Sequence, residues 1–297
     1  MTLEQKFVDI TVKFIDLVAK VLPDDVVGVL STLRDKETEP MAKAIYESMF
    51  ENMEKAVSMN RPICQDTGVL QFFLKVGTKF PLIDKLSDML LEATTVATNT
   101  VPLRHNAVET FIEKNTGTNT GKNVPYIEYG IVPNSDKLEM IVYMAGGGCV
   151  LPGRSMVMMP SAGYEGIADF VADTMVNWGI NACPPLVVGV GIGTCVASAA
   201  KLAKKASLRP LGTKNDNAQA HIMEQQLEKA LNGIGLGPQG IPGKAGCVLG
   251  VNVENMARHP SAMGAAVSFG CWAHRRGTIV FDAKLNYEIL DHKNTVL

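Results

Sequence analysis

Three cysteines stand in short segments of small residues flanked by proline or glycine: Cys64 in RPICQDTG, Cys183 in NACPPLVVG and Cys271 in SFGCWAHRR. They are far apart in the sequence, so they cannot form a local Cys-x-x-Cys zinc knuckle. A fold could still gather three thiolates around one iron–sulfur cluster and leave one iron open. An iron with an open coordination position is a Lewis acid. Taken alone, these residues leave two interpretations open, metal ligands or buried thiols.

The neighbourhoods of these cysteines differ from those of the remaining ones. Pro62 and Pro184 stiffen the backbone next to Cys64 and Cys183, and Gly270 before Cys271 lets the chain approach a bulky inorganic group closely. Cys195 and Cys247 stand inside apolar runs. A free cysteine in such a run usually behaves as a small hydrophobic residue, so we expect both of these to lie in the core.

Composition narrows the class of protein. The chain has 297 residues, enough for one large domain or two, with 46% hydrophobic residues, 20% charged residues and a net charge of −2. This balance provides no basic field for nucleic acid and no basic run for an anionic membrane. Charged residues interrupt the apolar N-terminus, which argues against a signal peptide or a membrane span. We expect a cytoplasmic protein with reduced thiols that binds a small molecule or another protein.

The pattern of apolar residues predicts an α/β fold. Leu3, Phe7, Ile10 and Phe14 recur at helical spacing, and further helices are expected after Pro23 and over 40–59. We therefore expect an N-terminal helical layer of about residues 1–60. From Cys64 onward, the runs VLQFFLKV, IVYMAGGG, LVVGVGIG, CVLGVNV and TIVFDA predict strands, and 163–178, 195–206 and 215–231 predict helices between them. This mixed α/β body follows the helical layer.

Phosphate-binding motifs nearly occur but fail on inspection. Gly189 and Gly191 follow a predicted strand, but Thr194 stands where a dinucleotide fingerprint needs its third glycine. The segments TNTGKN and IPGKAG each lack the first glycine and the final Ser or Thr of a P-loop. We interpret all three as turns. The glycine-rich segment 233–246 is either a hinge or an ordered loop, and its interspersed apolar residues favour the ordered loop.

Five segments together resemble the class I, iron–sulfur-dependent fumarase and tartrate dehydratase family. They are RPICQDTG, AGGGC at 145–149, NACPP, ARHP at 257–260 and GCWAHRRG, and they occur in the family's order. The resemblance runs from the N-terminal helices almost to the C-terminus. It implies a single alpha-type catalytic domain of an iron–sulfur hydro-lyase over 1–297. Single-chain fumarases of the family resemble this chain fused to a second domain, so the resemblance also implies a separate β subunit, in an α2β2 heterotetramer.

The resemblance assigns roles residue by residue. Cys64, Cys183 and Cys271 are expected to bind a 4Fe-4S cluster. Gln65, Arg104 and Gly147 are expected to bind the substrate, with Arg104 holding a carboxylate through its planar fork. Asp66 and His259 are expected to be catalytic. The implied reaction is dehydration of L(+)-tartrate to oxaloacetate, and the alternative is hydration of fumarate in a two-subunit fumarase. A non-catalytic zinc-binding or scaffold subunit is a more remote alternative.

Each role has a simpler interpretation. Asp66 could be a turn residue, Arg104 a surface cation, and His259 the cap of a turn. His274, Arg275 and Arg276 could form a solvated basic cluster or a contact with the β subunit. Family fumarases carry Ser after the glycines, whereas this chain has Cys149 followed by VLPGRS. That departure favours tartrate over fumarate, and we expect Cys149 to be a spare thiol rather than a fourth ligand.

Overall fold

The N-terminal segment folds as helices, as the sequence predicts. They are α1 (Leu3–Lys20), α2 (Asp24–Lys36) and α3 (Pro40–Ser58). Thr2 caps α1 by accepting a hydrogen bond from the Gln5 backbone N–H at 3.2 Å. Phe7 and Phe14 recur on one face of α1 and are fully buried, which is the helical spacing that the sequence shows.

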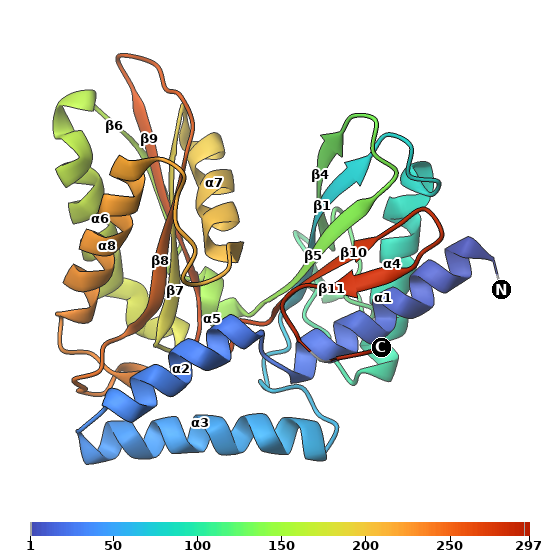
Figure 1. The fold of residues 1–297 in the computed structure, drawn as a ribbon, viewed down its shortest axis with the longest axis horizontal. Coiled ribbons are helices and arrows are strands. Elements are labelled where there is room, and N and C mark those ends of the chain that lie inside the picture. The colour runs from blue at the N-terminus through green and yellow to red at the C-terminus, as the bar shows by residue number, and fades with distance from the viewer. Residues whose placement is uncertain (1, 294) are drawn as a thin grey trace. The chain divides into compact units, whose positions relative to one another are not determined.

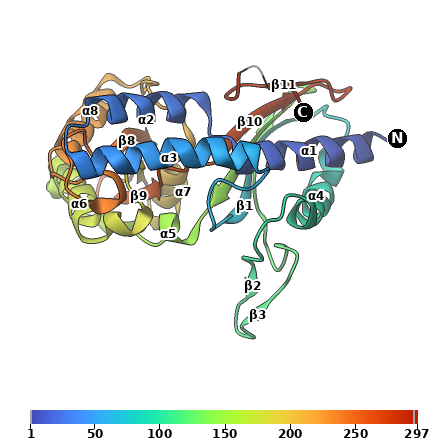
Figure 2. The same cartoon turned by 90° about the horizontal axis from the view of Figure 1, so that it is seen from below.

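The computed structural model describes residues 2–293 and 295–297 and is drawn in Figures 1 and 2. Its contacts divide the chain into two units, each built from separate stretches of sequence. Unit 1 comprises residues 1–24, 51–146 and 275–297, and unit 2 comprises residues 25–50 and 147–274. The sequence pattern had given no sign of this interleaving, because neither unit is bounded by a linker.

Unit 1 is built on a five-stranded sheet in the order β11-β10-β5-β1-β4. The strands are β1 (Val69–Gly77), β4 (Tyr126–Val132), β5 (Leu138–Ala145), β10 (Arg276–Phe281) and β11 (Tyr287–Ile289). Helices α1 and α4 (Leu86–Thr100) bury their apolar residues against it in one cluster. The short strands β2 (Val108–Glu109) and β3 (Lys114–Asn115) form a separate hairpin. Alternating burial along β1 is typical of a sheet with one covered face.

Unit 2 is built on a four-stranded sheet in the order β6-β9-β7-β8. The strands are β6 (Arg154–Met158), β7 (Leu186–Gly193), β8 (Val248–Asn255) and β9 (Met263–Gly270). Helices α6 (Gly163–Trp178) and α8 (Ala218–Asn232) pack on one face, and α7 (Val196–Leu208) packs on the other (Figure 1). The short helix α5 (Gly147–Val150) precedes β6. All residues of β7 are buried, as expected for a strand covered on both faces.

The glycines of β7 serve the packing of α7. A Cβ at Gly189 or Gly191 would overlap the backbone of α7 at Ala203 and Ala199 respectively. Both positions therefore need glycine so that the helix can lie directly on the strand. This explains the GVGIG pattern without a phosphate. The segment lies within β7, so its interpretation as a turn is wrong.

The glycine-rich segment 233–246 is an ordered loop, as the sequence favours. The Gly237 N–H donates to the Ile241 carbonyl at 2.7 Å, and the Gln239 N–H donates to the Pro184 carbonyl at 2.8 Å. Glu37 accepts hydrogen bonds from the backbone N–H groups of Lys244 and Ala245, both at 3.1 Å. The loop thus supports the chain next to Cys183.

Predicted and observed elements agree best for buried apolar runs and for the helices of unit 2. The sequence pattern missed α4, β4, β6 and β9, whose residues mix small, polar and apolar types.

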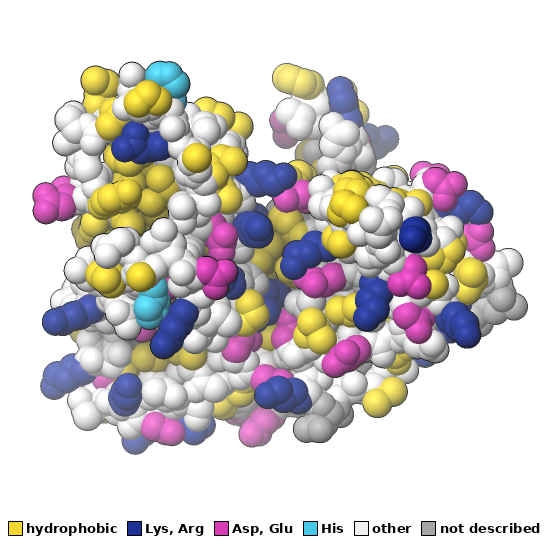
Figure 3. Space-filling view, turned by 45° about the horizontal axis from the view of Figure 1, so that its top comes forward, with side chains coloured by type: hydrophobic (Ala, Val, Ile, Leu, Met, Phe, Trp, Pro, Cys, Tyr) yellow, Lys and Arg dark blue, Asp and Glu magenta, His cyan; other side chains and the backbone are white. Residues whose placement is uncertain are grey.

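Among the described residues, no helix combines the length and the apolar character needed to cross a bilayer. On the face drawn in Figure 3, cationic and anionic side chains are interspersed, as the small net charge predicts.

Candidate functional site

The sheet of unit 2 brings two of the predicted cluster ligands to one end. Strands β7 and β9 are antiparallel, with Val187 opposite Gly270. Cys183 precedes β7 and Cys271 follows β9, so both stand at the end where β7 begins. The Trp272 N–H donates to the Cys183 carbonyl at 3.2 Å, which ties the two segments together. Cys183 is exposed in a left-handed turn with φ 57°, and Cys271 is buried.

Gly147 belongs to the same end of unit 2. It begins α5 and is exposed. A Cβ at the neighbouring Gly148 would lie 3.0 Å from the Asn181 carbonyl oxygen, in the turn that leads to Cys183. The glycine-rich segment can therefore approach this turn closely because it lacks side chains.

His259 lies at the opposite end of that sheet. It is exposed in the connection between β8 and β9, beyond the end where the parallel strands β7 and β8 finish. β7 is 8 residues long, and about 3.3 Å per residue separates the two ends by about 26 Å. The Ser261 N–H donates to His259 Nδ1 at 3.1 Å. Unit 2 therefore does not bring His259 together with Cys183, Cys271 and Gly147.

The loop from Cys64 to Gly68 in unit 1 is tightly positioned. The Ile63 N–H donates to the Ala19 carbonyl at 2.9 Å, and Asn52 Nδ2 donates to the Ile63 carbonyl at 2.7 Å. Gly68 has φ 76°, and a Cβ there would lie 2.7 Å from the Ala145 carbonyl carbon, so only glycine fits. These contacts fix the chain on both sides of Cys64, Gln65 and Asp66 just before β1.

Asp66 is a turn residue and is also bound by a second loop. Its Oδ1 accepts the Gly68 N–H at 2.9 Å, which is the local turn that the sequence allowed. The same Oδ1 accepts Asn106 Nδ2 at 3.2 Å. The Arg104 N–H donates to Thr67 Oγ1 at 2.9 Å. Unit 1 thus holds the backbone of Arg104 against the Asp66 turn and leaves the residue exposed. Sequence analysis missed Asn106, since an asparagine in a loop carries no distinctive signal.

The HRR segment after Cys271 is not a solvated basic cluster. His274, Arg275 and Arg276 are 2%, 1% and 1% exposed, which contradicts that alternative. Arg276 Nη1 pairs with Asp291 Oδ2 at 2.9 Å. A Cβ at Gly146 would lie 3.1 Å from Asp66 Oδ2 and 3.6 Å from Arg275 Nη2. The Asp66 carboxylate and the Arg275 guanidinium, both in unit 1, thus lie beside Gly146, the residue that follows β5.

The other cysteines fall into two kinds. Cys247 is fully buried, its thiol donates to the Leu231 carbonyl at 3.2 Å, and burial raises its pKa to about 12; it is a core residue, as predicted. Cys149 is buried as well. The prediction that Cys195 lies in the core is wrong. It is exposed at the N-terminus of α7, where hydrogen bonds from the backbone and hydroxyl of Ser198 lower its pKa to about 7.

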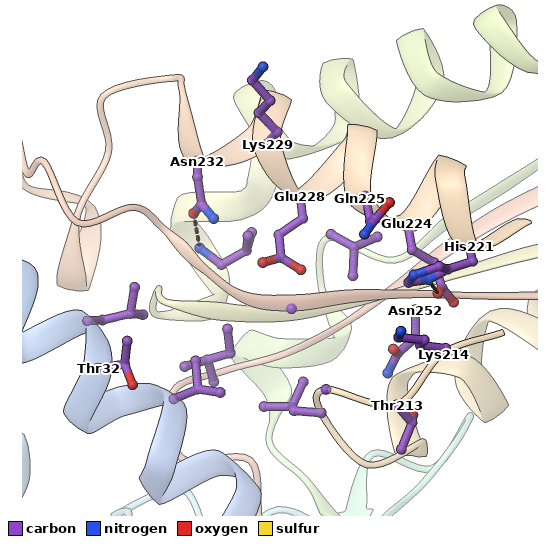
Figure 4. A pocket seen from close by; sticks show the side chains of 18 of the residues that line it. Thr32, Thr213, Lys214, His221, Glu224, Gln225, Glu228, Lys229, Asn232 and Asn252 are labelled. Carbon is purple, nitrogen blue, oxygen red and sulfur yellow. Dashed lines mark hydrogen bonds and ion pairs between the residues drawn. The ribbon is translucent and has the colours of Figure 1, made fainter.

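A cavity of about 560 Å³ lies within unit 2 between α2, α8 and β8 (Figure 4). Its most buried acid, Glu224, accepts from His221 Nδ1 at 3.1 Å and from the Val253 N–H at 2.9 Å, and it pairs with Arg209. Burial opposes ionisation of Glu224, yet these partners hold its pKa below the usual value. The Glu224 carboxylate is thus engaged in structural hydrogen bonds, and no predicted site residue lines the cavity.

The thiols of this chain fit an iron–sulfur cluster by their chemistry. The chain carries six cysteines, and thiolate is the usual ligand of such clusters. Among the described residues, no three or more His, Cys, Asp or Glu side chains are grouped so as to hold a metal ion. The Cys183 and Cys271 segments are the part of the expected ligand set that unit 2 brings together, whereas Cys64 lies in unit 1. The gathering of all three stays a prediction.

Comparison with known proteins identifies relatives over nearly the whole chain. The sequence model of the family described as Fumarate hydratase (Fumerase) matches residues 8–280. The L(+)-tartrate dehydratase subunit alpha of Escherichia coli strain K12 is 52% identical over 98% of this chain and 96% of its own length. The protein of that name in Shigella sonnei strain Ss046 has the same identity and coverage. A putative L(+)-tartrate dehydratase subunit alpha of Methanocaldococcus jannaschii is 35% identical, covering 94% of this chain and 100% of its own.

Proposed function

Because the chain belongs to the fumarate hydratase family, we propose that it is the α subunit of an iron–sulfur hydro-lyase that dehydrates L(+)-tartrate to oxaloacetate. The observation that carries the proposal is the meeting of the Cys183 and Cys271 segments at one end of the unit 2 sheet. The names of the relatives favour tartrate as the substrate. Fumarate or malate is the alternative substrate class, since the family model carries that description.

Cys64, Cys183 and Cys271 would hold a 4Fe-4S cluster through their thiolates. When bound, the cluster supplies a Lewis acid that stabilises the charge of the departing hydroxyl group. A zinc-loaded protein without iron or sulfide would contradict this assignment.

The residues of this chain bind and orient the diacid. Arg104 holds one carboxylate through its guanidinium fork, Gln65 donates to the substrate, and the backbone at Gly147 approaches it closely. Asp66 acts as a proton acceptor in a fixed orientation, because Gly68 and Asn106 bind its Oδ1. Removing one proton from carbon and one hydroxyl group yields water and the enol of oxaloacetate, which tautomerises to the ketone.

The site needs a second polypeptide. A diacid requires two carboxylate clamps, and Arg104 supplies one of them. The second clamp and the principal base would come from a β subunit, in an α2β2 heterotetramer. The α chain alone should therefore be inactive. The catalytic role of His259 is proposed from the family resemblance alone, since unit 2 holds it far from Cys183.

The test is coexpression with the cognate β chain, anaerobic purification, and assay of iron, sulfide and turnover of L-tartrate and malate. We expect about four irons per α chain, as a 4Fe-4S cluster requires, with turnover of L-tartrate above that of malate. Replacing Cys64, Cys183 or Cys271 by Ser should remove the cluster and the activity. The matched control, Cys195→Ser, should retain both. Preference for malate would establish the fumarase alternative, and unchanged iron in the three variants would refute the ligand assignment.

A further inference from the structure

The chain that follows Arg104 forms a projecting arm. We define the arm as residues 105–124. It contains the hairpin of β2 and β3, in which Val108 pairs with Asn115 and Glu109 with Lys114. The hairpin stands away from α4 and the sheet of unit 1 (Figure 2).

The tip of the arm is apolar and almost completely exposed. Phe111 is 96% exposed and Ile112 is 69% exposed, and both stand in the turn that joins β2 to β3. Phe111 also has φ 73°, a backbone conformation that is rare for bulky residues. Neither side chain contributes to the core of unit 1, and their exposure to water is unfavourable. Both side chains are therefore available to contact another protein.

The base of the arm is firmly held, so its tip has a defined place. Asn119 is 2% exposed. Its Oδ1 accepts the Asn106 N–H at 2.7 Å, and its Nδ2 donates to the Arg104 carbonyl at 2.9 Å. Across the hairpin, the Thr116 N–H donates to the Ala107 carbonyl at 2.9 Å, and Asn115 Nδ2 donates to the His105 carbonyl at 2.6 Å. An ordered arm binds at a smaller entropic cost than a flexible one.

Strand β4, which follows the arm directly in the sequence, also exposes apolar side chains. Tyr126, Tyr129 and Ile131 are 46%, 40% and 58% exposed. β4 is the last strand of its sheet and, among the described residues, pairs only with β1. An edge strand with exposed apolar side chains is a surface that another chain can extend. The arm and β4 thus offer a continuous stretch of sequence for docking.

The arm is also joined to the candidate site. Asn106, at its base, donates to Asp66, and Arg104 immediately precedes it. A protein bound on the arm would therefore lie next to the residues that we assign to the substrate. We infer that the arm, with Phe111 and Ile112 at its tip, is the surface on which the β subunit docks. This inference rests on the proposed function, in which the site is completed by another polypeptide.

The β subunit fits this surface better than a second copy of the chain. A second copy would bring only the groups that this chain already has, whereas the proposed function assigns a second carboxylate clamp and the principal base to another polypeptide. Docking of a different chain at the arm supplies both beside Asp66 and Arg104. The apolar tip supplies affinity, because aromatic anchors seated in a partner's pocket dominate binding energy.

The double variant Phe111→Ser/Ile112→Ser tests the inference, and Val57→Ser/Met59→Ser is its matched control. Val57 and Met59 are 59% and 65% exposed in the same unit, outside the arm. Each α variant is coexpressed with tagged β, and the complex is measured by native mass spectrometry and by titration of β into α. We expect the arm variant to bind β at least about 10-fold more weakly, as loss of a buried aromatic anchor predicts, and the control to bind normally.

Hydrogen exchange provides a second measurement that needs no variant. Amides of residues 108–115 in the wild-type chain should exchange more slowly once β is added. Equal β binding by the arm variant and its control, or unchanged exchange, would overturn the inference. The inference would also be overturned if the arm variant lost contact between two α chains but still bound β. These readouts do not depend on turnover, so an inactive complex with an arm-dependent interface would refute the proposed function alone.

Discussion

Asn106 Nδ2 donates to Asp66 Oδ1 at 3.2 Å and joins two loops that are far apart in the sequence. The same Nδ2 lies 3.1 Å from the Gly68 carbonyl. Asn106 therefore holds both the side chain and the turn of Asp66. A hydrogen bond to a charged acceptor is stronger than one between neutral groups, so this contact contributes to the orientation of the proposed proton acceptor.

Replacing Asn106 by Ala should lower kcat of the α–β complex by about 10- to 100-fold, because a hydrogen bond to a charged group contributes about 1.5–3 kcal/mol. Steady-state kinetics with L-tartrate measures the change, and iron content should stay normal. Asn99→Ala is the control, since Asn99 is an exposed residue whose Nδ2 donates to the Thr95 carbonyl within α4. An equal kcat for the two variants would show that Asp66 does not depend on Asn106.

Buried apolar runs predicted the elements well, but they could not predict the site. The run LVVGVGIG coincides with β7 because a strand covered on both faces is apolar throughout. The approach of Cys183 to Cys271 depends instead on the register of β7 against β9, which is a long-range property. The segment MGAAVSFG of β9 has too few β-branched residues to be recognised. Cys195 misled the prediction because it lies in the connection between β7 and α7, and the apolar run around it is divided between that strand and that helix.

Cys195 should react with alkylating reagents at neutral pH, whereas Cys247 should stay unreactive until the protein unfolds. The Ser198 hydrogen bonds lower the pKa of Cys195 from 9.0 to about 7, and burial raises that of Cys247 to about 12. The thiolate is the reactive form. Iodoacetamide labelling followed by peptide mass spectrometry should give a midpoint near pH 7 for Cys195. Ser198→Ala should move this midpoint upward, and an unmoved midpoint would contradict the assigned cause.

Asp291→Asn should destabilise unit 1. Asp291 is bonded to Arg276 at 2.9 Å and to the Thr278 N–H at 2.8 Å. Burial opposes ionisation, but His292 and Arg276 hold the pKa of Asp291 below its usual value. Removing one partner from a buried pair costs about 3–5 kcal/mol. Urea unfolding at pH 7 should show a free energy of unfolding that is lower by this amount. The control variant Asp84→Asn, at an exposed position, should show almost no change.

The stability that Asp291 contributes depends on pH with a defined sign. Because its folded pKa is lowered, this stability is fully present above the unfolded pKa of about 3.9. It is lost as the pH falls through the folded value. The difference between wild type and Asp291→Asn should therefore shrink as the pH falls below about pH 4. A difference that grows in acid would show that Asp291 is not ionised in the folded protein.

His259→Asn should leave the iron and sulfide content of the complex unchanged. His259 stands at the far end of the unit 2 sheet from Cys183 and Cys271, about 26 Å away along β7. A loss of cluster in this variant would contradict the placement of the β8–β9 connection. Turnover of L-tartrate by the cluster-loaded variant then measures the catalytic role that the family resemblance implies. Normal turnover would remove His259 from the proposed mechanism.

Gly191→Ala and Gly28→Ala should change stability in opposite directions. A Cβ at Gly191 would overlap the Ala199 carbonyl oxygen and the Ala203 nitrogen of α7, whereas one at Gly28 in α2 would meet nothing within 4 Å. Overpacking at Gly191 should cost about 1–3 kcal/mol, since the helix must move off the strand. Alanine at Gly28 should stabilise α2 by about 0.5–1 kcal/mol, because glycine loses more backbone entropy in a helix. Thermal unfolding measures both, and a neutral Gly191→Ala would show that α7 does not lie directly on β7.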